Sequence, residues 1–213
     1  MNDVYFGRFV RFDTVSKKEA TQLVGSDNLV GDVYEIEFRL QDRLSVAWLK
    51  NRFGVTVGFF DQQVSRQLSI FEARGWKICA ILALVAFTED PDPGHYWGEC
   101  ALICYDPQES DTFDVFLAGI AKRIAEGMRP DVDLNAPSVA KVLESQGSWS
   151  PMQYRSLPKQ DRGTVFIKTR RSIKEKLVEQ ARAGNKGCYI ANWVVLLAIA
   201  GGLFFLLRAC GVF

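Results

Sequence analysis

The chain has 213 residues, of which 48% are hydrophobic and 24% charged, with a formal net charge of +1. This is the composition of a globular protein with a sizeable core, and it excludes a disordered or collagen-like chain. The charge is unevenly spread, since residues 1–154 contain 15 Lys and Arg against 22 Asp and Glu, whereas residues 155–187 contain 10 against 3. The sequence therefore has an acidic first part, a basic segment and an apolar tail.

The first 60 residues predict mainly strands. Residues 5–12 are expected to form a first strand, and a short helix with capping-box spacing should follow and end near Gly25. Apolar and charged residues alternate over 34–40, and the alternation resumes over 44–48, which predicts two half-buried strands. A tight turn then leads into a strand over 55–60, giving a hairpin.

The middle of the chain predicts one helix and two strands. Asp61 is placed to cap a helix with a hydrophobic stripe, and Gly75 should end it. Residues 78–87 are almost entirely apolar but too few to cross a bilayer, so they predict a central strand buried on both faces. A turn-rich loop follows, and residues 96–105 should return as the neighbouring strand.

Two further helices are expected before a linker. Hydrophobic residues at helical spacing from Phe113 to Ile124 predict an amphipathic helix that ends at Gly127 and packs on the sheet. Asn135, followed by a proline, opens a third helix that Gly147 closes. Residues 148–163 contain two prolines and scattered polar residues, which is typical of a linker.

The predicted fold class is therefore α+β: a small antiparallel or mixed sheet with two or three packed helices, plus a C-terminal single transmembrane helix. The expected division is a cytosolic head, a linker, a basic juxtamembrane neck helix that includes a capping box at Ser172, a transmembrane helix and a short tail. Their bounds are 1–147, 148–163, 164–187, 188–207 and 208–213, respectively.

The apolar tail has the length of a membrane span. Residues 189–207 contain no charge, and as a helix they would be about 29 Å long, close to a hydrocarbon core of about 30 Å. Basic residues flanking a span tend to stay in the cytoplasm, and those of the neck far outnumber the lone Arg208 beyond it. The start of the chain lacks the features of a secretory signal. We therefore expect a single-pass protein with the head in the cytoplasm and the C-terminus outside.

Several residues of the neck and span are candidates for membrane contact. A basic cluster beside a span is attracted to anionic lipid head groups, and the anchor itself should contact the bilayer through aromatic and aliphatic side chains. Ala198 and Gly202 form a small-xxx-small pair that could support a homodimer. The lipid-contacting candidates are Arg170, Arg171, Lys174, Lys176, Arg182 and Lys186, and the anchor candidates are Tyr189, Trp193, Leu196, Leu197, Phe204 and Phe205.

Residues 55–71, VTVGFFDQQVSRQLSIF, are followed by an aliphatic strand, a loop, a second strand and a helix. This order resembles the second half of HIRAN domains, over about residues 44–124. The resemblance implies a small, mostly β module, in a family in which several members bind single-stranded DNA ends. The family's Asn-Pro-x-Asp-x-Asn-Ala stretch has no counterpart in residues 42–51, so its DNA contacts are not carried over. The acidic first part also argues against nucleic-acid binding.

Other sites are weakly supported by the sequence. His95 with Cys100 and Cys104 would suit zinc by ligand type, but the two cysteines would stand about 13 Å apart along a strand, so we expect buried core cysteines and no metal or cofactor. Reduced cysteines are expected in the cytosol, without structural disulfides. Catalysis would depend on His95 beside the acidic turn at residues 89–92, where no nucleophile motif is present.

The sequence thus favours a membrane-anchored cytosolic binding or adaptor module with an unidentified protein partner. An enzyme of unknown class with a site near His95 is the alternative, and a HIRAN-like nucleic-acid-binding head is a third possibility.

Overall fold

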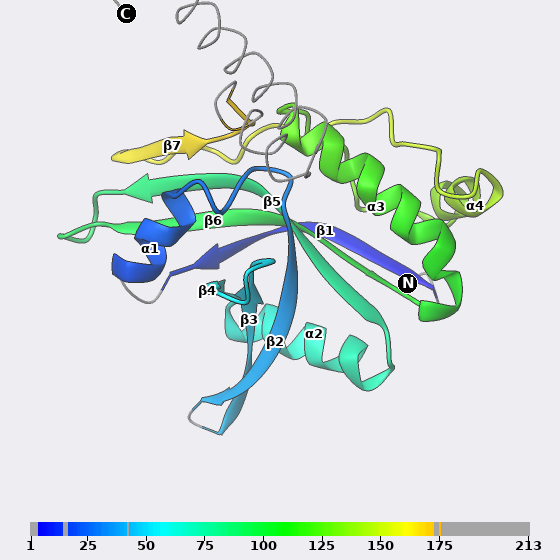
Figure 1. The fold of residues 1–213 in the computed structure, drawn as a ribbon, viewed down its shortest axis with the longest axis horizontal. Helices are drawn as coiled ribbons and strands as arrows, with labels where there is room; N and C mark the ends of the chain where they lie inside the picture. The colour runs from blue at the N-terminus through cyan, green and yellow to red at the C-terminus, as the bar shows by residue number, and fades with distance from the viewer. Residues whose placement is uncertain (1–3, 15–16, 42, 173–174, 176–213) are drawn as a thin grey trace, which may run out of the picture. The chain divides into compact units, whose positions relative to one another are not determined.

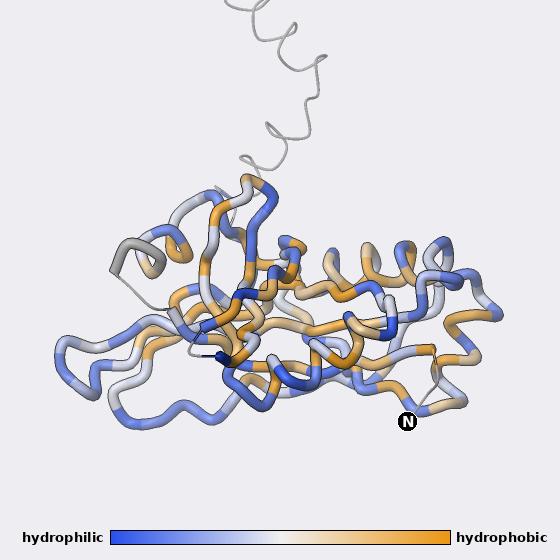
Figure 2. Tube along the Cα trace, turned by 90° about the horizontal axis from the view of Figure 1, so that it is seen from below, coloured by the Kyte–Doolittle hydropathy of each residue, from blue (hydrophilic) through white to orange (hydrophobic). Residues whose placement is uncertain are grey.

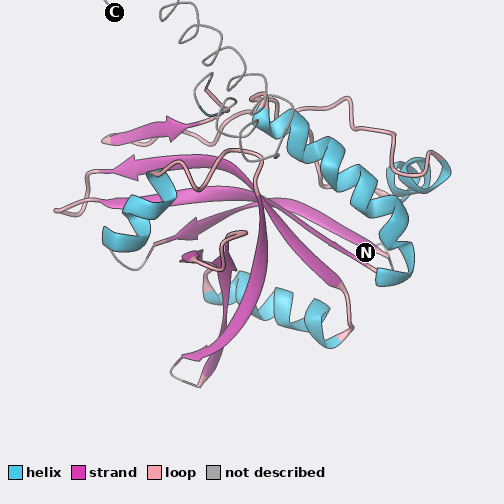
Figure 3. Cartoon of the chain, in the orientation of Figure 1, coloured by secondary structure: helices cyan, strands magenta, loops and turns pink. Residues whose placement is uncertain are grey.

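A computed structural model describes residues 4–14, 17–41, 43–172 and 175. By contacts, residues 1–171 form one compact unit and residues 172–213 a second one. We call the described part of the first unit the head. Its centre is a curved antiparallel sheet with helices on the outside (Figures 1 and 3).

Six strands of the head close into a barrel. Their order is β2-β3-β4-β1-β6-β5, and pairing of β5 with β2 completes the ring, while a seventh strand is added at β5. The strands are β1 (Tyr5–Asp13), β2 (Val33–Gln41), β3 (Leu44–Lys50), β4 (Thr56–Phe59), β5 (Lys77–Thr88), β6 (His95–Tyr105) and β7 (Thr164–Lys168). The helices are α1 (Lys17–Val24), α2 (Gln62–Ala73), α3 (Ser110–Ala125) and α4 (Ala136–Glu144), with a short 3₁₀ turn at Pro107–Glu109.

The closed barrel corrects the predicted fold class. The six barrel strands were predicted at nearly the right places, whereas β7 was not predicted. The small sheet with packed helices is wrong, because the sheet closes on itself. Closure depends on the pairing of Val33, Tyr34 and Glu35 with Ile81, Ala80 and Cys79. Alternation within one strand shows which face is buried but not which strand lies beside it, so a sequence pattern cannot distinguish an open sheet from a closed one.

The barrel is least regularly paired between β1 and β4. Only Asp13 and Phe59 are paired there, and the Phe12 ring fills the join. A Cβ atom on Gly58 or on Gly98 would lie within 2.6 Å and 2.3 Å of that ring, respectively. Strands β4, which carries Gly58, and β6, which carries Gly98, can therefore approach Phe12 closely only because these positions are glycine.

Two hydrophobic cores lie on opposite faces of the central strands. The inner core fills the barrel and includes side chains of α1 and α2, such as Leu23 and Leu68. The outer core packs α3 and α4 against β1, β5 and β6, with Phe113 and Phe116 beside Tyr5. Figure 2 shows hydrophobic residues concentrated along the middle of the head and hydrophilic residues at the loop ends. The expectation that 78–87 is buried on both faces is confirmed, since Ala80 to Ala86 are all buried.

Strand β5 is shared between two neighbours on one edge. Its first half pairs with β2, and its second half pairs with β7, from Val85 to Thr88. Lys168, the last residue of β7, is 9% exposed and donates hydrogen bonds to the carbonyl oxygens of Gly25 (2.7 Å), Asn28 (2.8 Å) and Leu23 (3.4 Å). Arg171 donates to Val30 O and pairs with Asp32 at 3.0 Å.

These contacts change the expected boundaries. Residues 164–168 form a strand of the head, where a neck helix was expected to begin, and the first compact unit extends to Arg171 instead of residue 147. Residues 148–163, expected to be a linker, run over the head and pair with it at Pro130 and Tyr154. The reason is that residues 148–163 find backbone partners at residues 129–131 and at Glu89, which local composition does not reveal.

Three predicted helix starts are confirmed by their capping contacts. Asp61 accepts a hydrogen bond from Val64 N, and Asn135 accepts one from Ser138 N. In the second unit, Ser172 N donates to Glu175 Oε2 at 2.7 Å and Glu175 N donates to Ser172 Oγ at 3.3 Å, which is the predicted reciprocal capping box.

Within the described residues, no helix is long and apolar enough to cross a membrane. The expected span over 188–207 and its tail over 208–213 lie outside those residues.

Candidate functional site

The candidate site is a cavity of about 510 Å³ on the outer side of β1 and β6. Phe9 and Glu99 line its floor from these strands, Arg129 comes from the segment after α3, and residues 154–159 form its other wall. We call this the Arg129 cavity, and we call residues 151–159 the strap.

Arg129 is held in place by the local chain path. Gly127 ends α3 with φ of +90°, and Met128 N returns to Arg123 O, a turn that glycine makes at little steric cost. The chain then runs antiparallel to the strap: Arg155 N donates to Arg129 O at 2.8 Å, and Asp131 N donates to Gln153 O at 2.9 Å. The strap is thus fixed at its first half, beside the Arg129 backbone.

The Arg129 guanidinium is a buried charge with incomplete pairing. Its side chain is 7% exposed, and Nη2 donates to Glu99 Oε2 at 2.5 Å. Its Cζ lies 4.3 Å from the centre of the Phe9 ring, within cation–π range. Its Nε and Nη1 are buried and have no hydrogen-bond partner in the part of the chain that the structure describes, although buried polar groups in proteins are almost always paired.

The second half of the strap is held only loosely. Its residues Ser156, Leu157, Pro158 and Lys159 make no hydrogen bond with any part of the chain that the structure describes. Lys159 is exposed and makes no ion pair there, whereas Arg155 pairs with Asp131 at 3.0 Å. The cavity therefore has one loosely held wall.

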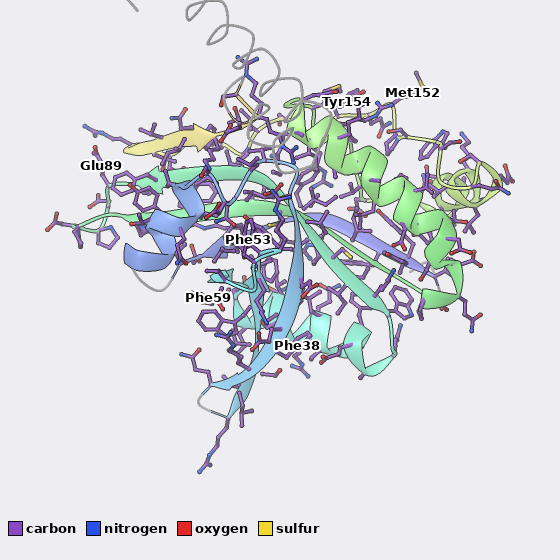
Figure 4. All side chains as sticks on the ribbon, viewed as in Figure 1. Phe38, Phe53, Phe59, Glu89, Met152 and Tyr154 are labelled. Atoms are coloured by element: carbon purple, nitrogen blue, oxygen red, sulfur yellow. The ribbon has the colours of Figure 1, made fainter. Side chains whose placement is uncertain are left out.

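Exposed hydrophobic side chains are concentrated along the same stretch of chain. Of the eleven large hydrophobic residues that are exposed in the described chain, five lie between residues 152 and 167. Figure 4 labels two of them, Met152 and Tyr154, on the segment that leads from α4 toward β7. We call these five the docking face: Met152 (88% exposed), Tyr154 (52%), Leu157 (42%), Val165 (55%) and Ile167 (41%).

Two smaller cavities of about 280 Å³ each border the head elsewhere. One lies between the strap and the start of α4, where Lys141 faces the Trp149 ring at 5.9 Å. The other lies beside the end of α1, where Asn28 and Asn51 form a buried hydrogen-bonded pair. Unlike the Arg129 cavity, these two cavities have no described lining residue with a buried polar side-chain atom that lacks a hydrogen bond.

The residues considered for catalysis lie apart from these cavities. His95 begins β6, and its Nε2 lies 3.2 Å from Nη2 of Arg11, which in turn pairs with Asp13. His95 lines none of the three cavities described above. Glu89 joins the β5 end to the chain before β7 through its backbone N–H, which donates to Gly163 O.

The cysteines considered as metal ligands belong to the strands. Cys100 and Cys104 are fully buried in the inner core, and burial raises the pKa of both thiols well above the ordinary value. Cys79 is partly buried and its thiol pKa is also raised, chiefly by desolvation. All three are free thiols. Among the described residues, no three His, Cys, Asp or Glu side chains are grouped so that they could hold a metal ion.

The candidates for lipid contact are divided by the structure. Arg170 is exposed on the head, but Arg171 is ion-paired within it. Lys174, Lys176, Arg182 and Lys186 lie outside the described residues, as do all six anchor candidates and the Ala198–Gly202 pair.

The sequence did contain one signal for the Arg129 cavity. Glu99 is the only acidic residue in the otherwise apolar and aromatic strand β6, and a charge out of pattern in a buried strand requires a partner. That the partner is Arg129, 30 positions later, could not be deduced from local pattern.

No protein-family model, curated protein or solved structure matches this chain. The function must therefore be inferred from its own residues.

Proposed function

We propose that this protein is a membrane-anchored binding module, whose cytosolic head binds a partner protein through the docking face and whose C-terminal span holds the head at the bilayer. The observation that supports partner binding is the exposed apolar pair Val165 and Ile167 on one face of β7, together with three further exposed hydrophobic side chains in the preceding residues 152–157. Single exposed hydrophobic residues are ordinary on soluble proteins, but concentrated ones are characteristic of interaction sites.

Backbone geometry adds to this support. Among the described strands, β7 pairs with β5 alone, so its other edge offers N–H and C=O groups to an added strand, a common mode of peptide recognition. Val165 and Ile167 lie on the exposed face of this strand. The partner should therefore present an extended segment with apolar side chains.

Charge restricts the partner further. Arg162 and Arg170 flank β7, both exposed and without an ion pair in the described chain. An acidic, apolar segment would complement them, whereas a basic segment would be repelled. The described residues of the docking face are apolar, apart from the flanking arginines, which favours a protein partner over a catalytic site.

The proposal is tested by site-specific photo-crosslinking of the full chain in native membranes. A photoreactive residue placed at Val165 should give an adduct of discrete mass, and the same residue placed at Leu40, which is 81% exposed on the β2–β3 hairpin, should not. Adding Ile167→Lys to the Val165 probe should lower the adduct yield at least fivefold, because a charge opposes apolar packing. Equal labelling from both positions, or undiminished yield with Ile167→Lys, would refute the docking face.

A further inference from the structure

Three buried or nearly buried cations of the head can be compared directly. Lys168 donates to three carbonyl oxygens, and Arg171 donates to Val30 O and to Asp32. Among the described residues, the Arg129 guanidinium has one hydrogen-bond partner, Glu99, and two buried nitrogens without one. A buried charged donor without an acceptor destabilises a fold. Lys168 and Arg171 avoid this cost, whereas Arg129 does not.

The surroundings of Arg129 indicate what would complete it. Three cations line the cavity, Arg129, Arg155 and Lys159, against one carboxylate, Glu99. Arg155 is partly neutralised by Asp131 and Asp133 outside the lining, which leaves Lys159 as the uncompensated charge at the rim. An additional negative charge fits this balance, and a second cation does not.

The strap supplies further donors on the same side. The backbone N–H groups of Ser156, Leu157 and Lys159, and the Ser156 hydroxyl, make no hydrogen bond within the described chain. Free backbone amides combined with Arg and Lys side chains are the usual means of binding oxyanions. Because residues 156–159 are held by no hydrogen bond, they can shift to admit a ligand to Nη1 without breaking one.

From these observations we propose that the Arg129 cavity is a binding site for a phosphate group, held by the side chains of Arg129 and Lys159 and by the backbone N–H groups of Ser156, Leu157 and Lys159. The site takes a different ligand from the proposed protein contact, although Tyr154 and Leu157 belong to both. The nearby Glu99 carboxylate opposes the incoming anion, so binding should be of moderate strength. The phosphate is either that of a soluble phosphate compound or that of a lipid head group, which have the same chemistry at this site.

The test uses thermal unfolding of the full chain in a neutral detergent, with sodium phosphate replacing sodium chloride at constant ionic strength. The wild-type Tm should rise saturably by about 3 °C, as expected for a ligand that binds only the folded state. Arg129→Lys, which keeps the charge facing Glu99 but lacks the guanidinium donors, should bind phosphate at least tenfold more weakly. Lys159→Gln, at an exposed position, should weaken binding about threefold.

The matched control is Arg66→Gln, which removes an exposed arginine of α2 far from the cavity in the chain and should leave the phosphate response unchanged. A second arm places the chain in nanodiscs with or without phosphatidic acid. Stabilisation by free phosphate identifies a soluble source, and stabilisation by phosphatidic acid alone identifies a lipid head group. If Arg129→Lys is too unstable to assay, Lys159→Gln still decides the matter. Equal Tm shifts in the wild type and Lys159→Gln, or no shift in either arm, would overturn the proposal.

Discussion

At the scale of single residues, the head is stabilised by polar groups that connect distant parts of the chain. Asp114 on α3 is one: it accepts a hydrogen bond from the Tyr105 hydroxyl at 2.5 Å and pairs with Lys77 at 2.9 Å. These contacts connect α3 with the ends of β5 and β6. The hydrogen bond from Tyr105, followed by that from Lys77, lowers the pKa of Asp114, because both contacts favour the ionised carboxylate.

This pKa shift predicts a pH dependence of stability. A carboxyl group whose pKa is lower in the folded state stabilises the fold above its unfolded pKa of about 3.9 and loses that contribution as the pH falls through the folded value. The wild type should therefore exceed Asp114→Asn in free energy of unfolding at pH 7, and the gap should narrow by pH 3. Denaturant titrations at both pH values, followed by tryptophan fluorescence, measure it.

Asp111→Asn is the control for that comparison. It removes a carboxylate from the same helix, one that makes no ion pair in the described chain. A gap for Asp114→Asn that stays the same or widens toward pH 3 would show that the ion pair and the Tyr105 hydrogen bond do not favour the charged form.

At the scale of elements, the strands and helices were largely predictable, because each one carries its own signal. Alternation marked β2 and β3, and capping residues marked α2 and α4. What could not be predicted is the pairing between elements. The closure of β2 onto β5 and the addition of β7 each join residues 44 or more positions apart, and the periodicity within a strand carries no information about its neighbour.

The candidate site was unpredictable for the same reason. The Arg129 cavity combines β1, β6, the segment after α3 and the strap, and the composition of the strap indicated a linker. Prolines and polar residues are typical both of linkers and of ordered segments that lie on a surface. Only the backbone pairing with residues 129–131 distinguishes the two.

Closure of the barrel gives a prediction at this scale. Gly98→Ala places a methyl group 2.3 Å from Phe12 and 2.9 Å from Leu84 O, so β6 must move away from β1 and β5. The expected loss is about 1–3 kcal/mol in free energy of unfolding, typical of an overpacked core. Gly119→Ala is the matched control, because an added Cβ meets nothing within 4 Å and the helix should gain about 1 kcal/mol.

Urea titration of both variants measures these changes. If Gly98→Ala is as stable as the wild type, the close approach of β6 to Phe12 is not needed for the barrel, and glycine is not required at position 98.

At the scale of the whole molecule, part of the basic segment belongs to the head, because the first unit extends to Arg171. Six of the ten Lys and Arg residues between 155 and 187 precede residue 172 and thus belong to the head. Residues 1–171 therefore contain 21 basic and 23 acidic residues, so their net charge is nearly balanced. The segment over 172–187 retains four basic residues against two acidic ones. Attraction to anionic lipid at about 1 kcal/mol per basic residue is therefore weaker than the full set of ten would give.

The orientation predicted for the span does not depend on the six basic residues of the head, because it follows from the residues closest to the span. Lys174, Lys176, Arg182 and Lys186 still precede it, against Arg208 alone beyond it, and the excess of Lys and Arg marks the cytoplasmic side.

Protease added to sealed vesicles with the cytoplasmic face outward should digest the head of nearly all molecules. Replacing these four residues with Gln should reduce that fraction, whereas Arg170→Gln with Lys159→Gln, two exposed changes within the head, should not. A head that is protected in wild-type vesicles, and digested only after detergent is added, would place it on the opposite side of the membrane and remove the basis for a cytosolic partner.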